Sequence, residues 1–93
     1  MATHYIAAVH LSGGSEHKHV TNMVWMNGST FKSGLNGTAE MVEFIENKSG
    51  DVKVSDGQTA VPVGVVHPTD GKPYIRTHKD GKWTDNLLAL PHY

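Results

Sequence analysis

The segment Tyr74–Gly81 carries the residue types best suited to holding a phosphorylated ligand. In a strand every second side chain points to the same face, so Tyr74, Arg76 and His78 would lie together. A guanidinium binds phosphate through two hydrogen bonds, the Thr77 hydroxyl adds a donor, and an aromatic ring offers a face on which a base can stack. Arg76 is the only arginine in the chain. The alternative is an ordinary edge strand in which Arg76 forms an ion pair with Asp80 or with Asp85.

The segment Thr84–Pro91 follows directly and combines polar and apolar residues. Asp85 and Asn86 could orient ligand hydroxyls, or they could cap the last turn of the chain. Leu87, Leu88 and Leu90 have the character of a tail that docks on the core. We expect capping of the last turn and docking on the core to explain at least half of the residue pattern in this segment.

Histidines form the third group, with His17 and His19 flanking Lys18 and with His4 and His10 earlier in the chain. On a strand, two imidazoles at positions i and i+2 could share a metal ion. The alternative is that they are exposed histidines of a loop. No third ligand stands at a regular spacing, and the chain has no cysteine, so we predict no metal and no cofactor.

Motifs of catalysis are missing from the sequence. It contains no nucleophile elbow, no glycine-rich phosphate loop before a helix, and no paired carboxylates in an apolar run. We therefore expect the protein to bind a ligand rather than to convert it.

Length and composition limit the protein to one small domain, residues 1–93. The formal net charge of −1 argues against binding of bulk nucleic acid, which needs a basic surface. No apolar run approaches the roughly 20 residues that cross a bilayer, and the N-terminus does not resemble a signal peptide. These features predict a protein of the cytoplasm with no membrane partner, the host cytoplasm if a phage encodes it.

The pattern of apolar residues predicts an α+β fold in the order ββαβββ with a short C-terminal turn or tail. We expect an antiparallel sheet of about five strands and one main helix. The predicted strands are Tyr5–Leu11, Val20–Asn27, Val52–Val54, Ala60–Val66 and Tyr74–His78, and the helix is Thr38–Lys48.

Turn residues define the connections. Thr38 is expected to cap the helix and Gly50 to end it. Asp56-Gly57 predicts a hairpin turn, and Pro62 predicts an edge strand or a bulge. Phe31–Gly37 is expected to be a loop, and Lys79–Lys82 a turn. Because both faces of Tyr5–Leu11 are largely apolar, we also expect a homo-oligomer.

Several of these motifs resemble the bacterial and phage family catalogued as domain of unknown function 3892. The resemblance is carried by Tyr5-Ile6, Gly13-Gly14, His17–Val20 and Val24-Trp25, and above all by Tyr74–Thr77, Asp80-Gly81 and Asp85–Pro91. It extends over nearly the whole chain, but the family name implies no function.

The length and the closing segment from Arg76 to Leu88 are also similar to the first-described class of phage Thoeris anti-defence proteins. That resemblance implies a non-catalytic sponge for cyclic ADP-ribose isomers, with Arg76 on a ligand phosphate and assembly as a dimer or hexamer; some such sponges also hold cyclic oligonucleotides. The residues expected to contact the ligand are Tyr74, Arg76, Thr77, His78, Asp85, Asn86, His19 and Trp25. The alternatives are a small structural or partner-binding domain that uses an edge strand at Pro62, and a hydrolase of a small nucleotide with His19 or His78 as its base.

Overall fold

A computed structural model describes residues 3–48, 50–55 and 58–93. Within these ranges the chain forms a sheet of seven strands, one α-helix and one short 3₁₀ helix, so the α+β class is confirmed. The elements are β1 (Thr3–Leu11), η1 (His17–His19), β2 (Val20–Asn27), β3 (Ser33–Gly37), α1 (Thr38–Asn47), β4 (Asp51–Ser55), β5 (Ala60–Val66), β6 (Tyr74–Lys79) and β7 (Lys82–Thr84). No helix in the described ranges is long and apolar enough to span a membrane.

The sheet is mixed rather than antiparallel throughout, and its strand order is β3-β2-β1-β4-β5-β6-β7. β1 pairs with β4 in parallel, from Thr3 to Tyr5, while the other pairs of neighbouring strands are antiparallel. The parallel pair arises because β2, β3 and α1 form a crossover between β1 and β4. The prediction of a purely antiparallel sheet was therefore wrong.

Two of the seven strands lie where the sequence predicted none. β3 occupies most of the expected loop Phe31–Gly37, and its Gly34 pairs directly with Trp25 of β2. β7 follows a tight turn at Asp80 and Gly81, both of which have positive φ angles. This confirms the predicted turn Lys79–Lys82, whose first and last residues pair across the hairpin.

The connections partly follow the predictions. β4 and β5 form the expected antiparallel pair, while the Asp56-Gly57 turn between them lies outside the described residues. β5 has β4 on one side and β6 on the other, so it is not an edge strand. Pro62 pairs with Lys53 of β4, and the pairing with β6 begins one residue later, at Val63. The missing N–H of Pro62 therefore removes no hydrogen bond between β5 and β6.

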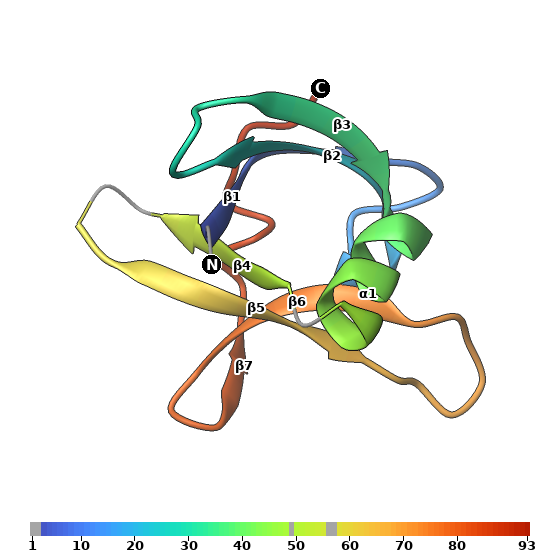
Figure 1. The fold of residues 1–93 in the computed structure, drawn as a ribbon. Coiled ribbons are helices and arrows are strands. Elements are labelled where there is room, and N and C mark those ends of the chain that lie inside the picture. The colour runs from blue at the N-terminus through green and yellow to red at the C-terminus, as the bar shows by residue number, and fades with distance from the viewer. Residues whose placement is uncertain (1–2, 49, 56–57) are drawn as a thin grey trace.

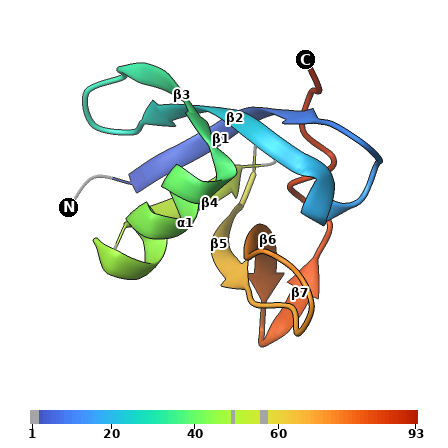
Figure 2. The same cartoon turned by 90° about the vertical axis from the view of Figure 1, so that its right-hand side faces the viewer.

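The sheet curves around α1 (Figures 1 and 2). β1, β2 and β3 form one side of the curve, β4 to β7 form the other, and α1 lies on the concave side. The helix accordingly contacts β2 and β3 at one end of the strand order and β5 and β6 at the other. The core lies between sheet and helix, and it includes Ile6, Val9, Met23, Met41, Val52, Val54, Val63, Ile75 and Leu87.

The start of α1 differs in detail from the prediction. The N-cap is Gly37, whose N–H donates to Oε1 of Glu40 over 3.1 Å. Thr38 is already helical, and its hydroxyl donates to the carbonyl of Val20 over 2.6 Å, which ties the helix to β2. The predicted cap at Thr38 was therefore wrong by one residue. At the other end the N–H of Gly50 donates to the carbonyl of Phe44, consistent with the predicted stop.

The C-terminal segment after β7 returns to the first strand. Leu87 is fully buried, and turns are closed by bonds from the Leu88 N–H to Asp85 and from the Leu90 N–H to Leu87. Val9 of β1 then donates its N–H to the carbonyl of Pro91 and accepts from the N–H of Tyr93. The tail therefore docks on the core and extends the pairing of β1.

Candidate functional site

The two faces of β6 have different roles. Ile75 and Thr77 are fully buried, whereas Tyr74, Arg76 and His78 lie half-buried on the opposite face. The three residues predicted to share a face of this strand therefore do so. The strand holds them rigidly because it is paired with β5 on one side and with β7 on the other.

The guanidinium of Arg76 is fixed by two hydrogen bonds. Nε donates to the carbonyl of Thr84 over 3.1 Å, and Nη2 donates to Oδ1 of Asp85 over 2.8 Å. Of the two alternatives, the ion partner of Arg76 is thus Asp85 rather than Asp80. An arginine has five N–H donors, and within the described part of the chain Nη1 makes no hydrogen bond. The side chain is 29% exposed, so these free donors can be reached from solvent.

A chain of hydroxyl and amide groups supports this arrangement from behind. The hydroxyls of Thr77 and Thr84 lie 2.6 Å apart, and the Thr84 hydroxyl donates to Oδ1 of Asn86 over 2.7 Å. Thr77 is fully buried on the core side of β6 and lines neither of the two cavities described below. Thr77 and Asn86 were both expected to contact a ligand. They instead hold Thr84 through its hydroxyl, and the backbone carbonyl of Thr84 in turn positions Arg76.

His17 is a residue of the site that the sequence prediction did not include. It lies in η1 after the two glycines, its side chain is only 9% exposed, and its Nε2 stands 3.9 Å from Oδ1 of Asp85. This distance is too long for a hydrogen bond, and within the described residues Nε2 has no partner. A polar atom that is buried without a partner is costly, so this nitrogen has a capacity for one more interaction.

The environment of His17 disfavours its protonated form. Its pKa is lowered below the ordinary value of 6.5, first because burial removes water from the ring and second because the Arg76 guanidinium is near. Asp85 acts in the opposite direction and raises the pKa. His17 is therefore neutral near pH 7, and an added negative charge beside Arg76 and His17 would favour its protonation.

His17 and His19 do not act as a pair. The Nδ1 atom of His19 accepts the backbone N–H of Glu16 over 3.1 Å, and its ring lies against Gly14, where a side chain would collide with it. His17 instead faces Asp85. No group of three or more His, Cys, Asp or Glu that could hold a metal ion occurs in residues 3–48, 50–55 and 58–93.

A wide, half-open cavity of about 1320 Å³ joins these groups, and we call it the Arg76 cavity. Four of the predicted site residues line it, namely Tyr74, Arg76, Asp85 and His19. Its other walls come from η1 and the start of β2, from the first turn of α1, and from the loop between β5 and β6. Its lining includes His17, Lys18, Lys72, Glu16 and Asp70.

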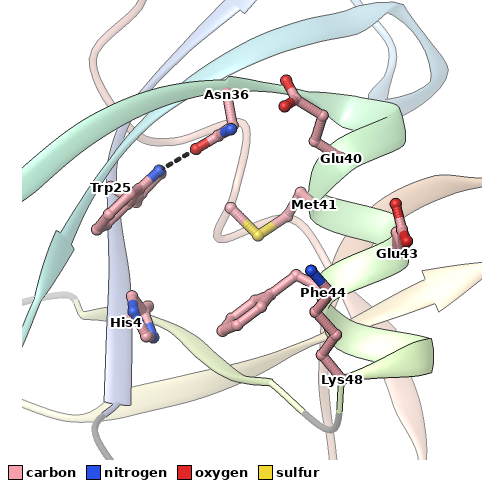
Figure 3. Close-up of a pocket in the computed structure, with 8 residues that line it drawn as sticks. All are labelled: His4, Trp25, Asn36, Glu40, Met41, Glu43, Phe44 and Lys48. Carbon is pink, nitrogen blue, oxygen red and sulfur yellow. Dashed lines mark hydrogen bonds between the residues drawn. The ribbon is translucent and has the colours of Figure 1, made fainter.

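Two predicted residues lie elsewhere. The ring of His78 packs edge-on against Trp83 of β7, with 5.7 Å between centroids, and lies outside the Arg76 cavity. Trp25 lies on the other flank of α1, where it lines a smaller cavity of about 330 Å³ (Figure 3). We call this second space the Trp25 cavity; its further lining residues are His4, Asn36, Glu40, Met41, Glu43, Phe44 and Lys48.

Comparison with known proteins identifies the family but no activity. No curated protein and no solved structure matches the chain. Residues 5–91 match the sequence model of the family described as "Protein of unknown function (DUF3892)". This range includes most of β1, the Arg76 site and the tail as far as Pro91. The chain therefore belongs to the DUF3892 family.

Proposed function

We propose that this protein is a non-catalytic binding protein that sequesters a nucleotide-derived anionic ligand in the Arg76 cavity. The observation that carries the proposal is the state of the Arg76 guanidinium. Thr84 and Asp85 hold its Nε and Nη2 atoms, while Nη1 has no hydrogen bond within the described residues. A fixed cation with free donors at the wall of a cavity is suited to a phosphate, because little conformational entropy remains to be lost on binding.

The rest of the cavity offers room and suitable chemical groups for a nucleotide. A volume of about 1320 Å³ exceeds what a nucleotide-sized ligand needs. The ring of Tyr74 offers a stacking surface. Two lysines also line the cavity; Lys18 lies 3.5 Å from Glu16, so Lys72 is the better placed to contact an anion. The N-terminal end of α1, from its N-cap Gly37 to Ala39, also lines the cavity, and the helix dipole there favours an anion.

Binding without turnover is favoured over hydrolysis by the positions of the histidines. His78 is occupied with Trp83 outside the cavity, and Nδ1 of His19 already accepts from Glu16. His17 stands 3.9 Å from Asp85, so the two do not form the hydrogen-bonded pair by which a carboxylate orients a catalytic imidazole.

The ligand class we propose is an immune messenger: a cyclic ADP-ribose isomer first, and cyclic oligonucleotides second, which would make the protein an antagonist of bacterial defence.

The proposal includes a homo-oligomer, because the Arg76 cavity is open and one small chain encloses little of a ligand. Large apolar side chains are exposed around β2 and β3: Met26 is 38%, Leu35 60% and Phe31 74% exposed. A second copy could cover them, and light scattering at micromolar concentration tests this. A monomer mass would contradict the oligomer.

The same exposed residues also favour the second candidate function, a partner-binding domain, which predicts no affinity for nucleotides.

The direct test is to identify what the purified protein carries. Mass spectrometry of the small molecules released by denaturation should detect an intact phosphorylated nucleotide, which also separates sequestration from hydrolysis. Calorimetric titration with cyclic ADP-ribose isomers and cyclic oligonucleotides then measures affinity. If the protein binds neither class, the proposed function is wrong.

Substitutions assign the site. Arg76→Ala should weaken binding roughly ten- to a hundredfold, since a charge-assisted bidentate contact is lost, and Arg76→Lys should restore only part of it. Lys79→Ala is the matched control, because Lys79 is exposed at the end of the same strand and does not line the cavity. Thermal melts of each variant separate loss of binding from loss of fold. A folded Arg76→Ala variant that binds as tightly as wild type would remove Arg76 from the site.

A further inference from the structure

The Trp25 cavity is built from aromatic rings and is separated from the Arg76 cavity by α1. The ring of His4 makes edge contacts with two others: its centroid lies 5.3 Å from that of Trp25 at 70°, and 5.0 Å from that of Phe44 at 81°. Figure 3 shows these three rings around one space, with Asn36 on β3 and Met41 on α1 completing the wall. The volume of about 330 Å³ suits a small molecule.

Glycines allow the rings of Trp25 and Phe44 to approach the backbone closely. A Cβ atom on Gly34 would stand 2.5 Å from Cζ2 of Trp25, and a Cβ on Gly50 would collide with the ring of Phe44. Trp25 is also anchored by a hydrogen bond from Nε1 to Oδ1 of Asn36. Because each ring lies close against a glycine, Trp25 and Phe44 form walls of the cavity rather than mobile surface side chains.

The charges around this cavity are mainly negative. Two carboxylates of α1, Glu40 and Glu43, line it together with a single ammonium, that of the exposed Lys48. The lining of the Arg76 cavity on the other flank of the helix differs, because its three cations, Arg76 and two lysines, are matched by three carboxylates. Aromatic faces attract a cation through their quadrupoles, and nearby carboxylates add to that attraction.

We propose that the Trp25 cavity is a second binding site, for a small free organic cation that carries an N-methylated ammonium group. Such a group is bulky and weakly hydrated, so it gains from contact with several aromatic faces at once. A phosphate would meet Glu40 and Glu43 at this cavity. The site is independent of the proposed function, because its lining shares no residue with that of the Arg76 cavity.

Choline and its uncharged isostere 3,3-dimethylbutan-1-ol provide a test that requires no change to the site. Trp83 lies outside the cavity, so in a Trp83→Phe protein Trp25 is the remaining tryptophan and its fluorescence reports binding. Choline should change this emission saturably and bind at least about fivefold more tightly than the alcohol, consistent with a cation–π contribution. Equal affinity for both, preference for the alcohol, or no response to either would overturn the proposal.

Surface variants test the charge without disturbing the fold. Glu43→Gln should weaken choline binding about two- to threefold, and Lys48→Ala should strengthen it by a similar factor. Glu46→Gln, on the same helix but outside the lining, should leave it unchanged. In calorimetry, Trp25→Leu should weaken binding roughly tenfold. Effects of Glu43→Gln and Lys48→Ala in the same direction would contradict the role of charge.

The source of the cation is distinguished by a vesicle experiment. The protein is sedimented with vesicles of phosphatidylcholine, whose headgroup carries the same trimethylammonium group as choline. If the cavity takes a free cation, the protein should stay in the supernatant while choline still binds. Retention on the vesicles that added choline reverses would overturn the assignment to a free cation.

Discussion

Nε2 of His17 lies 3.9 Å from Oδ1 of Asp85, the same oxygen that accepts the 2.8 Å hydrogen bond from Arg76. One carboxylate oxygen thus stands between a permanent cation and a buried imidazole. The three groups come from η1, β6 and the tail, so their meeting depends on the complete fold. The proton affinity of His17 is the most direct measure of this arrangement.

Arg76→Gln and Asp85→Asn should shift the pKa of His17 in opposite directions. The Arg76 cation lowers this pKa and the Asp85 anion raises it, so removing Arg76 should raise it and removing Asp85 should lower it further. NMR titration of the His17 ring protons measures both shifts. Asp80→Asn, in the exposed turn before β7, is the control that should change nothing. Shifts in the same direction would show that altered burial, not charge, controls the ring.

The unfolding free energy should depend on His17 in mildly acidic solution. Because its pKa is lowered in the folded state, the unfolded chain binds this proton more readily. Neutral His17 therefore contributes fully to the free energy of unfolding above the ordinary pKa of 6.5, and this contribution is lost as the pH falls below that value. His17→Gln should flatten the fall in stability below that pH, by at most about 1.4 kcal/mol per pH unit. Denaturant unfolding of wild type and the variant at several pH values measures this change.

Thr77→Val should destabilise the fold by about 1–2 kcal/mol although it conserves the shape of the side chain. The Thr77 hydroxyl is fully buried and lies 2.6 Å from that of Thr84, which loses this partner in the variant. Urea unfolding measures the change. Thr21→Val is the comparison: Thr21 is exposed and its hydroxyl bond to His10 is long, at 3.3 Å, so the cost should stay within about 0.5 kcal/mol. Equal effects would mean that the buried bond contributes nothing.

Leu87→Ala should cost about 2–4 kcal/mol, because it opens a cavity where the tail docks on the core. Leu87 is fully buried, whereas Leu35 on β3 is 60% exposed. Leu35→Ala removes the same atoms and should change stability by less than about 0.5 kcal/mol in dilute protein. Thermal or chemical unfolding of the two variants makes the comparison. A small effect of Leu87→Ala would show that the docked tail is not part of the cooperative core.

Strands with many apolar residues could be predicted from the sequence, but β3 could not. β2 has the predicted bounds, Val20–Asn27, because its apolar and β-branched residues favour extended structure. β3 reads Ser-Gly-Leu-Asn-Gly, which is typical of a loop. It is extended because it pairs with β2, and its Gly34 leaves room for the ring of Trp25. The parallel pairing of β1 with β4 likewise depends on contacts between distant segments.

The candidate site was predictable as a set of side chains on one strand and less so as a cavity. Alternation alone placed Tyr74, Arg76 and His78 on one face of β6. It could not show that His78 packs on Trp83. His17 was missed as a site residue because its burial follows from the packing of η1 near β6, to which the local sequence gives no clue.

The docking of the tail on β1 has a consequence for how the chain folds. Val9 bonds to Pro91 and Tyr93, and the neighbouring contact between His10 and Tyr93 joins positions 83 residues apart. The entropic cost of closing a long loop grows only slowly with its length, but folds rich in such distant contacts reach their native state slowly. The local hairpins β2–β3 and β6–β7 can form early. We expect the docking of the tail on β1 to be slower, because it requires a search between segments at opposite ends of the chain.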